Sequence, residues 1–170
     1  MVLAHITSLS RLVLAPIVIL VLNSSLEYRG LIAAVLTALA GITDTIDGML
    51  ARRSGSTSKL GVFLDPAADK IFVLTTLFGL SNLGMIPLWV PGINLMRDLM
   101  INVLRSGAAS EGVIISASWW GKVKTVVSFP AMIAIMLGLP FAFESILLFT
   151  ALSVFSGVLY AIKFRDSFTG

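Results

Sequence analysis

Six long apolar segments separated by short polar ones define the pattern of this chain. They cover residues 9–22, 31–50, 60–80, 85–105, 122–140 and 142–163, and they approach the ~20 residues that carry a helix across a bilayer core. A half-buried strand would alternate apolar and polar positions, and these runs do not. The small and polar stretches 54–58 and 106–118 predict loops. Because lipid offers backbone groups no partners, the pattern predicts an all-α membrane protein with six transmembrane helices in one domain, residues 1–170.

The composition agrees with a membrane protein and limits the chemistry. Hydrophobic residues make up 57% of the chain and charged residues 12%, and the mean hydropathy is +0.99, far from an average soluble domain. The absence of cysteine excludes disulfides, thiolate nucleophiles and thiolate metal sites. The net charge of +3 fits membrane orientation and anionic lipid headgroups better than nucleic acid, which we do not expect as a partner.

The basic residues are distributed unevenly between the two predicted sides. With six spans, both termini and the second and fourth connections share one side, and that side carries Arg11, Arg52, Arg53, Lys59, Arg105, Lys122, Lys124, Lys163 and Arg165. The opposite side carries Arg29. Because an excess of Lys and Arg marks the cytoplasmic side, we expect an inner- or plasma-membrane protein with both termini in the cytosol. The residues that fit interfacial anchors are Trp89, Trp119 and Trp120.

Four aspartates lie inside or at the edges of the second and third apolar segments: Asp44, Asp47, Asp65 and Asp69. An ionised carboxylate at the centre of a membrane helix costs about 2.5–3.5 kcal/mol even on the most lenient scale, so the group requires compensation. The i,i+3 and i,i+4 spacings place each pair on one side of its helix. Pro66 can be accommodated if it falls in the first turn of the third helix. From the helix rise, all four carboxylates meet just beneath the cytosolic face.

The chemistry of this acidic group favours hard cations. Oxygen-only ligands suit Mg²⁺ or Mn²⁺. A pair of such ions ~3.5–4 Å apart neutralises a diphosphate and stabilises the attacking and leaving oxygens of a displacement. Gly48, next to Asp47, leaves room for a ligand or a neighbouring helix. The alternative is a structural cluster in which the aspartates are protonated or paired with arginines.

Segment 44–69 matches the pattern D-x2-D-G-x2-A-R-x8-G-x3-D-x3-D at every fixed position, and it resembles the signature of the CDP-alcohol phosphotransferases. The resemblance implies the six-helix membrane fold of that family and a homodimer. It implies a two-ion site whose ligands are Asp44, Asp47, Asp65 and Asp69. It also implies that Asp69 would be the general base. The expected catalytic residues are Asp65 and Asp69. The implied CDP-binding surface includes Asp44, Gly48, Ala51 and Arg52.

The fourth apolar segment has a polar side formed by Asn94, Arg97, Asp98, Asn102 and Arg105. Intramembrane charges usually face the bundle interior or a wet cavity and mark a functional path. Two lysines begin the fifth segment, so the sequence predicts an acceptor-phosphate site formed by Arg97, Arg105, Lys122 and Lys124. Two alternatives stay open: Arg97 only packs as part of an internal ion pair, and the lysines only reflect membrane orientation.

The stretch from Arg97 to Thr125 favours one acceptor. Its GKVKT run at 121–125 is similar to the bacterial phosphatidylglycerophosphate synthases, a subgroup that uses glycerol 3-phosphate. The resemblance implies direct transfer of a phosphatidyl group from CDP-diacylglycerol to glycerol 3-phosphate, with CMP as leaving group. Alternative acceptors are phosphatidylglycerol, which gives cardiolipin, and inositol phosphate. A divalent-cation transporter would need polar residues towards the outer side, where every span is almost uniformly apolar.

Overall fold

The computed structural model consists of helices throughout the residues that it describes. It describes the backbone of residues 2–54, 59–112 and 119–169 and the side chains of residues 10–43, 67–112, 119–121 and 123–165. The helices in these ranges are α1 (Val2–Leu22), α2 (Arg29–Ser54), α3 (Lys59–Asn82), α4 (Trp89–Ser110), α5 (Trp119–Met136) and α6 (Ala142–Thr169). The same ranges contain no strand. The prediction of an all-α chain with a long helix at each apolar segment is confirmed.

The end of α4 differs from the sequence prediction. The helix continues to Ser110, whereas a loop was expected from Ser106, because the small residues there include two alanines, the best helix formers. The helix stops where Gly112 adopts a φ of +75°. There the backbone N–H groups of Glu111 and Gly112 donate to the carbonyls of Ala108 and Ala109 at 3.2 and 3.1 Å, a common way to end a helix.

The position of Pro66 is a second difference. Because α3 already begins at Lys59, this proline lies well inside the helix. It does not lie in the first turn, the position at which the sequence analysis could accommodate it. An internal proline removes one backbone hydrogen bond and crowds the carbonyl four residues before it. Membrane helices tolerate this more readily, since neighbouring groups satisfy the freed carbonyl. The condition is not met because the apolar residues before Pro66 extend the helix towards its N-terminus.

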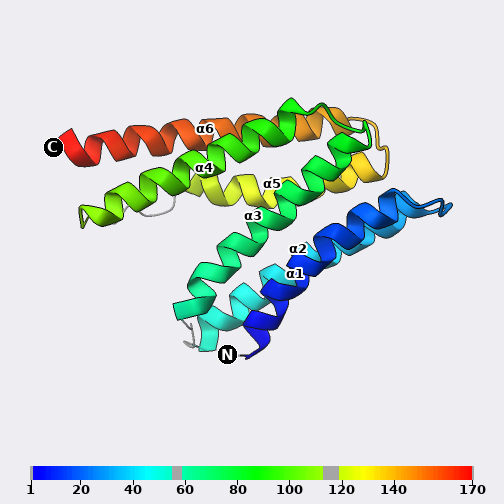
Figure 1. The fold of residues 1–170 in the computed structure, drawn as a ribbon, viewed down its shortest axis with the longest axis horizontal. Coiled ribbons are helices and arrows are strands. Elements are labelled where there is room, and N and C mark those ends of the chain that lie inside the picture. The colour runs from blue at the N-terminus through cyan, green and yellow to red at the C-terminus, as the bar shows by residue number, and fades with distance from the viewer. Residues whose placement is uncertain (1, 55–58, 113–118, 170) are drawn as a thin grey trace.

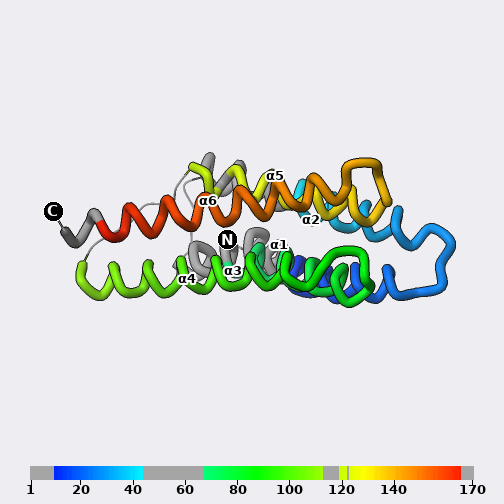
Figure 2. The backbone as a smooth tube through the Cα atoms, turned by 90° about the horizontal axis from the view of Figure 1, so that it is seen from above, coloured from blue at the N-terminus to red at the C-terminus, as the bar shows by residue number. Residues whose placement is uncertain are grey.

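The helices form two layers. One layer contains α1, α3 and α4, and the other contains α2, α5 and α6 (Figure 2). Within the layers, α3 packs against α1 and α4, and α5 packs against α2 and α6, while the α1–α2 and α4–α6 contacts join the layers. The connections α1–α2, α3–α4 and α5–α6 lie at one end of the bundle, here called the turn end (Figure 1). The start of α1 and the end of α6 lie at the opposite end, here called the terminal end.

The core lies where both layers meet. Its fully buried side chains come from several helices and include Val18, Phe72, Leu77, Met132 and Phe149. The rings of Phe72 and Phe129 stack with centroids 5.7 Å apart. Helix α1 approaches α3 closely at Gly79, where an added Cβ atom would collide with the side chain of Ile19. This packing fixes α1 and α3 against each other along the part of α3 that follows Asp69.

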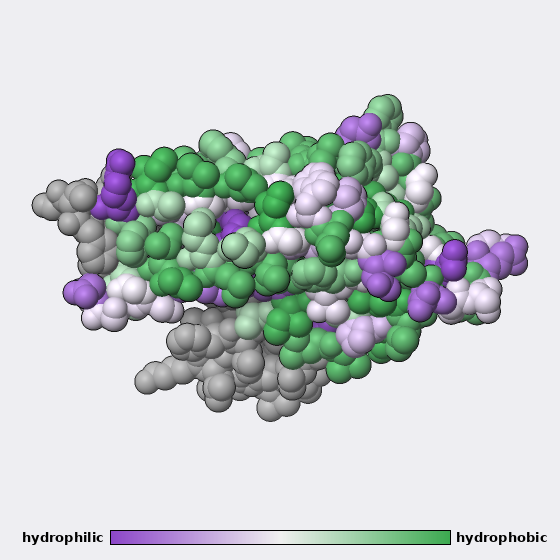
Figure 3. Space-filling model, turned by 45° about the horizontal axis from the view of Figure 1, so that its top comes forward, coloured by the Kyte–Doolittle hydropathy of each residue, from purple (hydrophilic) through white to green (hydrophobic). Residues whose placement is uncertain are grey.

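Large apolar side chains also cover much of the outside of the bundle (Figure 3). Val103 and Met96 are each 70% exposed and Val126 is 73% exposed. Among the described residues, the segment Ala142–Arg165, of 24 residues and mean hydropathy 2.1, is the one helical stretch long and apolar enough to cross a membrane on these criteria. Shorter apolar helical segments are Ser10–Leu22 and Arg29–Thr43. Six membrane crossings therefore stay a prediction.

Candidate functional site

The four aspartates of the sequence motif lie on two continuous helices. Asp44 and Asp47 belong to α2, and Asp65 and Asp69 belong to α3. The helix is continuous through each pair. Among these four side chains the structure describes that of Asp69. Also outside the described side chains are the predicted CDP-binding residues Asp44, Gly48, Ala51 and Arg52.

Asp69 forms an ion pair with Arg11 of α1. A terminal guanidinium nitrogen of Arg11, Nη1, donates to Oδ1 of Asp69. Arg11 is 1% exposed and is the largest fully buried side chain among the described residues, so this pair supplies the counter-charge that an enclosed carboxylate requires. The side chain of Asp69 is 22% exposed, which leaves part of the carboxylate accessible. Asp69 is thus paired with an arginine. The alternative to a metal site, a structural cluster of aspartates, included such pairs.

Sequence reasoning missed the role of Arg11 at this site. It counted the residue as part of the positive excess on the cytosolic side, whereas the structure places it inside the bundle. A signal was present, because Arg11 is a single charge among apolar residues at the start of a predicted span. Charges in that setting usually face the bundle interior and find a partner.

Arg97 lies between α4 and α6, where each side-chain nitrogen has a protein partner. Its Nε donates to the Ser153 carbonyl at 3.2 Å, its Nη2 to Ser156 Oγ at 2.5 Å and its Nη1 to Asp98 Oδ1 at 2.7 Å. Gly157 provides the space, since an added Cβ atom would lie 3.0 Å from Arg97 Cγ. Arg97 therefore forms an internal ion pair, as one of the two open alternatives supposed.

Lys124 of α5 meets the same carboxylate. Its Nζ donates to Asp98 Oδ1 at 2.9 Å and lies 5.9 Å from the centroid of the Phe149 ring. Lys124 and Asp98 are both buried, at 7% and 5% exposure. Ordinary membrane orientation does not require such burial, so Lys124 is more than a surface charge near a span end. Asp98 joins α4 to α5 through Lys124 and lies next to the α4–α6 contact made by Arg97.

Arg105 and Lys70 extend this group of charges towards the terminal end. Arg105 Nε donates to the Tyr160 hydroxyl at 3.3 Å, and its guanidinium lies 5.7 Å from the centroid of the same ring. Lys70 Nζ donates to Asn102 Oδ1 at 2.6 Å and thereby links α3 to α4. The side chain of Lys122, the remaining predicted acceptor-phosphate residue, lies outside the described ones.

These side chains form one electrostatic unit, here called the cation cluster: Lys70, Arg97, Arg105 and Lys124 with Asp98. The charge of Lys70 interacts with those of Asp98, Arg105 and Arg97, and the charge of Lys124 interacts with those of Asp98, Arg97 and Lys70. The cluster has four cations and one carboxylate, a formal excess of three positive charges. An anion with several oxygen acceptors is the ligand that this arrangement suits. Because Lys70 directly follows Asp69, the cluster adjoins the aspartate site.

Residues 1–159 match the protein-family model described as CDP-alcohol phosphatidyltransferase. The chain belongs to this family. The match includes both aspartate-bearing helices and the whole cation cluster. The family and the enzyme class expected from the aspartate pattern are confirmed.

Relatives of this CDP-alcohol phosphatidyltransferase are named for particular reactions within the family. The chain is 38% identical over 169 residues to the probable phosphatidylglycerophosphate synthase of Mycobacterium tuberculosis, which covers 95% of this chain and 80% of the relative. It is 30% identical over 151 residues to the CDP-diacylglycerol–glycerol-3-phosphate 3-phosphatidyltransferase of Bacillus subtilis, covering 81% and 78% of the two chains. It is 44% identical over 72 residues to the CMP-forming cardiolipin synthase of Streptomyces coelicolor, covering 42% and 34%.

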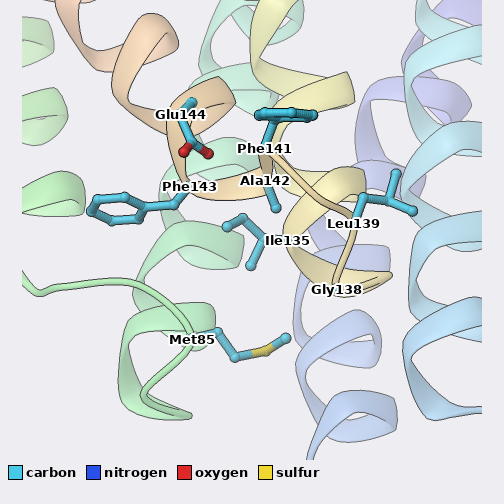
Figure 4. Close-up of a pocket in the computed structure, with 8 residues that line it drawn as sticks. All are labelled: Met85, Ile135, Gly138, Leu139, Phe141, Ala142, Phe143 and Glu144. Atoms are coloured by element: carbon cyan, nitrogen blue, oxygen red, sulfur yellow. The ribbon is translucent and has the colours of Figure 1, made fainter.

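A separate pocket of about 400 Å³ lies at the turn end of this CDP-alcohol phosphatidyltransferase. Its lining comes from the α3–α4 connection and from the region where α5 passes into α6 (Figure 4). Glu144 is the charged residue among the lining side chains, and the others are apolar or glycine. The pocket lacks the grouped charges that a diphosphate or a phosphorylated acceptor requires. The aspartate site and the cation cluster therefore remain the candidate site.

Proposed function

We propose that this chain transfers the phosphatidyl group of CDP-diacylglycerol to glycerol 3-phosphate, giving phosphatidylglycerophosphate and CMP. The observation that carries this proposal is the similarity, over 95% of the chain, to a protein named probable phosphatidylglycerophosphate synthase. The Bacillus subtilis relative, whose name specifies both substrates, is similar over 81% of the chain. The cation cluster adds independent support, because glycerol 3-phosphate carries the anionic group that such a cluster binds.

The metal site proposed for this reaction uses Asp44, Asp47, Asp65 and Asp69. Its donor set is consistent with Mg²⁺ or Mn²⁺, because carboxylate oxygens are the ligands that hard divalent cations prefer. The observed helices α2 and α3 run unbroken through both aspartate pairs, as two converging pairs of ligands require. When bound, two such ions would neutralise the diphosphate and stabilise the attacking and leaving oxygens.

The protein groups would position the reactants for a direct displacement. Asp69 accepts the proton of the acceptor hydroxyl, and the oxygen then bonds to the lipid-linked β-phosphorus as the bond from that phosphorus to the CMP oxygen breaks. Arg11 holds the carboxylate of Asp69 from inside the bundle. Gly48, Ala51 and Arg52 of α2 would bind the CDP portion. Transfer of this kind depends mainly on position and electrostatics, so no covalent enzyme intermediate is needed.

The acceptor phosphate would bind at the terminal end of the cation cluster. Arg105 is exposed there, and Lys122 belongs to the first turns of α5. Lys124 and Arg97 are engaged with Asp98, so their charges attract the phosphate from within the bundle. All four residues of the predicted acceptor-phosphate site thereby keep a proposed role, and Arg105 is the exposed one among those whose side chains the structure describes.

Phosphatidylglycerol is the alternative acceptor, and one observation favours it. The similarity to the Streptomyces coelicolor cardiolipin synthase reaches 44% identity, but it covers 42% of this chain. The relative named as a probable phosphatidylglycerophosphate synthase covers 95% of this chain, and the relative named for glycerol 3-phosphate covers 81%. We therefore place glycerol 3-phosphate first and phosphatidylglycerol second. Inositol phosphate, a further candidate from the sequence, has the anionic group that the cluster suits.

We also propose that the bundle spans the inner or plasma membrane with its terminal end in the cytosol. The apolar exterior, the membrane-length segment in α6 and the exposed Trp89, Trp119 and Trp120 support this placement. Such an orientation admits the soluble substrates from the cytosol while the acyl chains stay in the lipid. The homodimer implied by the family resemblance stays a prediction.

Purified protein in detergent or liposomes tests the reaction. With CDP-diacylglycerol, glycerol 3-phosphate and Mg²⁺ or Mn²⁺, we expect release of CMP and formation of phosphatidylglycerophosphate. Phosphatidylglycerol and inositol phosphate in parallel reactions identify the preferred acceptor. A clear preference for phosphatidylglycerol would move the chain to the alternative, and no CMP with any acceptor would reject the proposal.

A further inference from the structure

Lys70 connects the aspartate site to the cation cluster. It follows Asp69 on α3, is partly buried, and donates from Nζ to Asn102 Oδ1 on α4 at 2.6 Å. Its charge interacts with those of Arg97, Arg105 and Asp98. Consecutive residues on one helix turn thus face two different groups: Asp69 meets Arg11 of α1, and Lys70 meets α4.

The hydrogen bonds of Lys70 are incomplete within the described part of the chain. A lysine ammonium has three N–H donors, and the one described acceptor is the neutral side chain of Asn102. Lys124 differs, because its ammonium forms an ion pair with buried Asp98 at 2.9 Å. Arg97 also pairs with Asp98 and has two further partners. Lys70 is therefore the lysine of the cluster whose charge lacks a directly bonded carboxylate among the described residues.

The charge balance indicates what would complete this arrangement. The cluster has an excess of three positive charges, and a phosphate monoester carries about −1.5 to −2 at neutral pH with three strong acceptor oxygens. Lysine binds phosphate as a compact point charge. Asp98, Asn102 and Arg105 are spaced four and three residues apart and share one side of α4. Lys70 meets this side at Asn102, between the buried carboxylate and exposed Arg105.

We infer that Lys70 binds the phosphate of the acceptor through the free N–H donors of its ammonium. This inference rests on the proposed function, and it adds to the predicted acceptor site a residue from the helix that carries Asp69. The two ends of a short acceptor such as glycerol 3-phosphate then contact two adjacent residues of α3. Its phosphate meets Lys70 and its attacking hydroxyl meets Asp69, which sets the orientation in which the hydroxyl faces the CDP-lipid.

Two variants distinguish phosphate binding by Lys70 from a purely structural role, in which Lys70 only links α3 to α4. Lys70→Met removes the charge and keeps the aliphatic chain, whereas Asn102→Ala removes the hydrogen bond between α3 and α4 and keeps the charge. We expect Lys70→Met to raise the KM for glycerol 3-phosphate by about tenfold or more, since hydrogen bonds to charged groups are the strong ones, with the KM for CDP-diacylglycerol changed less than about twofold. Asn102→Ala should raise the glycerol 3-phosphate KM less than about threefold.

Lys70→Arg retains the positive charge and should recover most of the affinity that Lys70→Met loses. Equal effects of Lys70→Met and Asn102→Ala would show that Lys70 only braces the helices, and would overturn the inference. An equal rise in both KM values, or a rise confined to CDP-diacylglycerol, would overturn it as well. If Lys70→Met does not fold, Lys70→Gln replaces it with the same expectations.

Binding without turnover separates this inference from the proposed function. Glycerol 3-phosphate should raise the thermal unfolding midpoint of the wild-type protein in detergent, and it should raise that of Lys70→Met much less at the same concentration. If the wild-type protein is stabilised but releases no CMP, the proposed reaction fails while the comparison of the two midpoint shifts still tests Lys70. If glycerol 3-phosphate stabilises both proteins equally, or neither, Lys70 does not bind the acceptor phosphate.

Discussion

Arg11 and Asp69 form an ion pair inside the bundle, and this pair constrains any role of the carboxylate. Arg11 is buried, and a buried cation without a partner is costly, so the ionised form of Asp69 is part of what holds α1 against α3. The same ionised carboxylate is the form that accepts a proton or ligates a cation. The ionised carboxylate of Asp69 therefore serves both the packing of α1 against α3 and the proposed catalysis. A substitution that tests catalysis with the least effect on packing must keep the hydrogen bond from Arg11.

Asp69→Asn is the first such substitution. Asparagine keeps an oxygen that accepts from Arg11 but removes the negative charge that balances this buried cation. We therefore expect phosphatidyl transfer to fall by at least about a thousandfold, while the protein still folds with a lower unfolding midpoint. Release of CMP and thermal unfolding in detergent are the two measurements. Glu144→Gln, at the exposed turn end, is the control and should retain wild-type activity. Near-normal turnover by Asp69→Asn would remove this residue from the mechanism.

Arg11→Met tests the ion pair itself. It leaves the carboxylate of Asp69 in an enclosed position without its partner, which costs about 3–5 kcal/mol in a fully buried pair. Because the Asp69 side chain is 22% exposed, we expect a smaller loss of about 1–3 kcal/mol. The double variant Arg11→Met/Asp69→Asn should be more stable than the sum of the single changes predicts. Strict additivity of the unfolding free energies would show that the two side chains do not interact.

At the scale of helices, apolar periodicity predicts the number and type of elements but not their partners. Each predicted segment became a helix, and the errors lay at the ends, at Ser106 and near Pro66, where small residues and upstream apolar residues extend the helices. The sequence also identified the polar side of α4. It did not identify Ser153, Ser156 or Tyr160, because their hydrogen bonds to α4 arise only when α6 packs beside it.

Gly79 provides a test of the α1–α3 contact. An added Cβ atom would collide with Ile19, so we expect Gly79→Ala to destabilise the protein by about 1–3 kcal/mol, the usual cost of overpacking. Gly107→Ala in α4 is the matched control, since nothing lies within 4 Å of the new atom, and alanine favours a helix over glycine by up to about 1 kcal/mol. The unfolding midpoints in detergent should therefore move in opposite directions.

Ile19→Ala should partly rescue Gly79→Ala by making space on α1. This rescue distinguishes a steric effect from a change in backbone flexibility, because flexibility would respond to Gly79→Ala alone. If both glycine variants raised the midpoint, the two helices would be farther apart than the contact requires.

At the scale of the whole molecule, the aspartate motif and the cation cluster come from different helices and adjoin through α3. Spacing within one helix revealed the two aspartate pairs and the polar side of α4, since side chains three or four residues apart share a face. Neighbours across helices, such as Lys124 with Asp98 or Lys70 with Asn102, depend on the two-layer packing. Local sequence patterns do not encode that packing, so the composition of the site was predictable and its internal pairing was not.

The orientation of the bundle leads to a prediction about accessibility. The α1–α2 connection lies at the turn end and α4 ends at the terminal end (Figure 1), and the three helices α2, α3 and α4 separate exposed Ser25 from exposed Ser110. Three crossings place the two residues on opposite sides of a membrane.

The chain has no cysteine, so Ser25→Cys and Ser110→Cys each introduce a single thiol. In intact cells, a membrane-impermeant maleimide should label Ser25→Cys, and it should label Ser110→Cys only after permeabilisation. Labelling of both thiols from the outside would mean that an even number of these helices crosses, and the reverse pattern would place the site outside the cytosol, where CDP-linked substrates are not available to it.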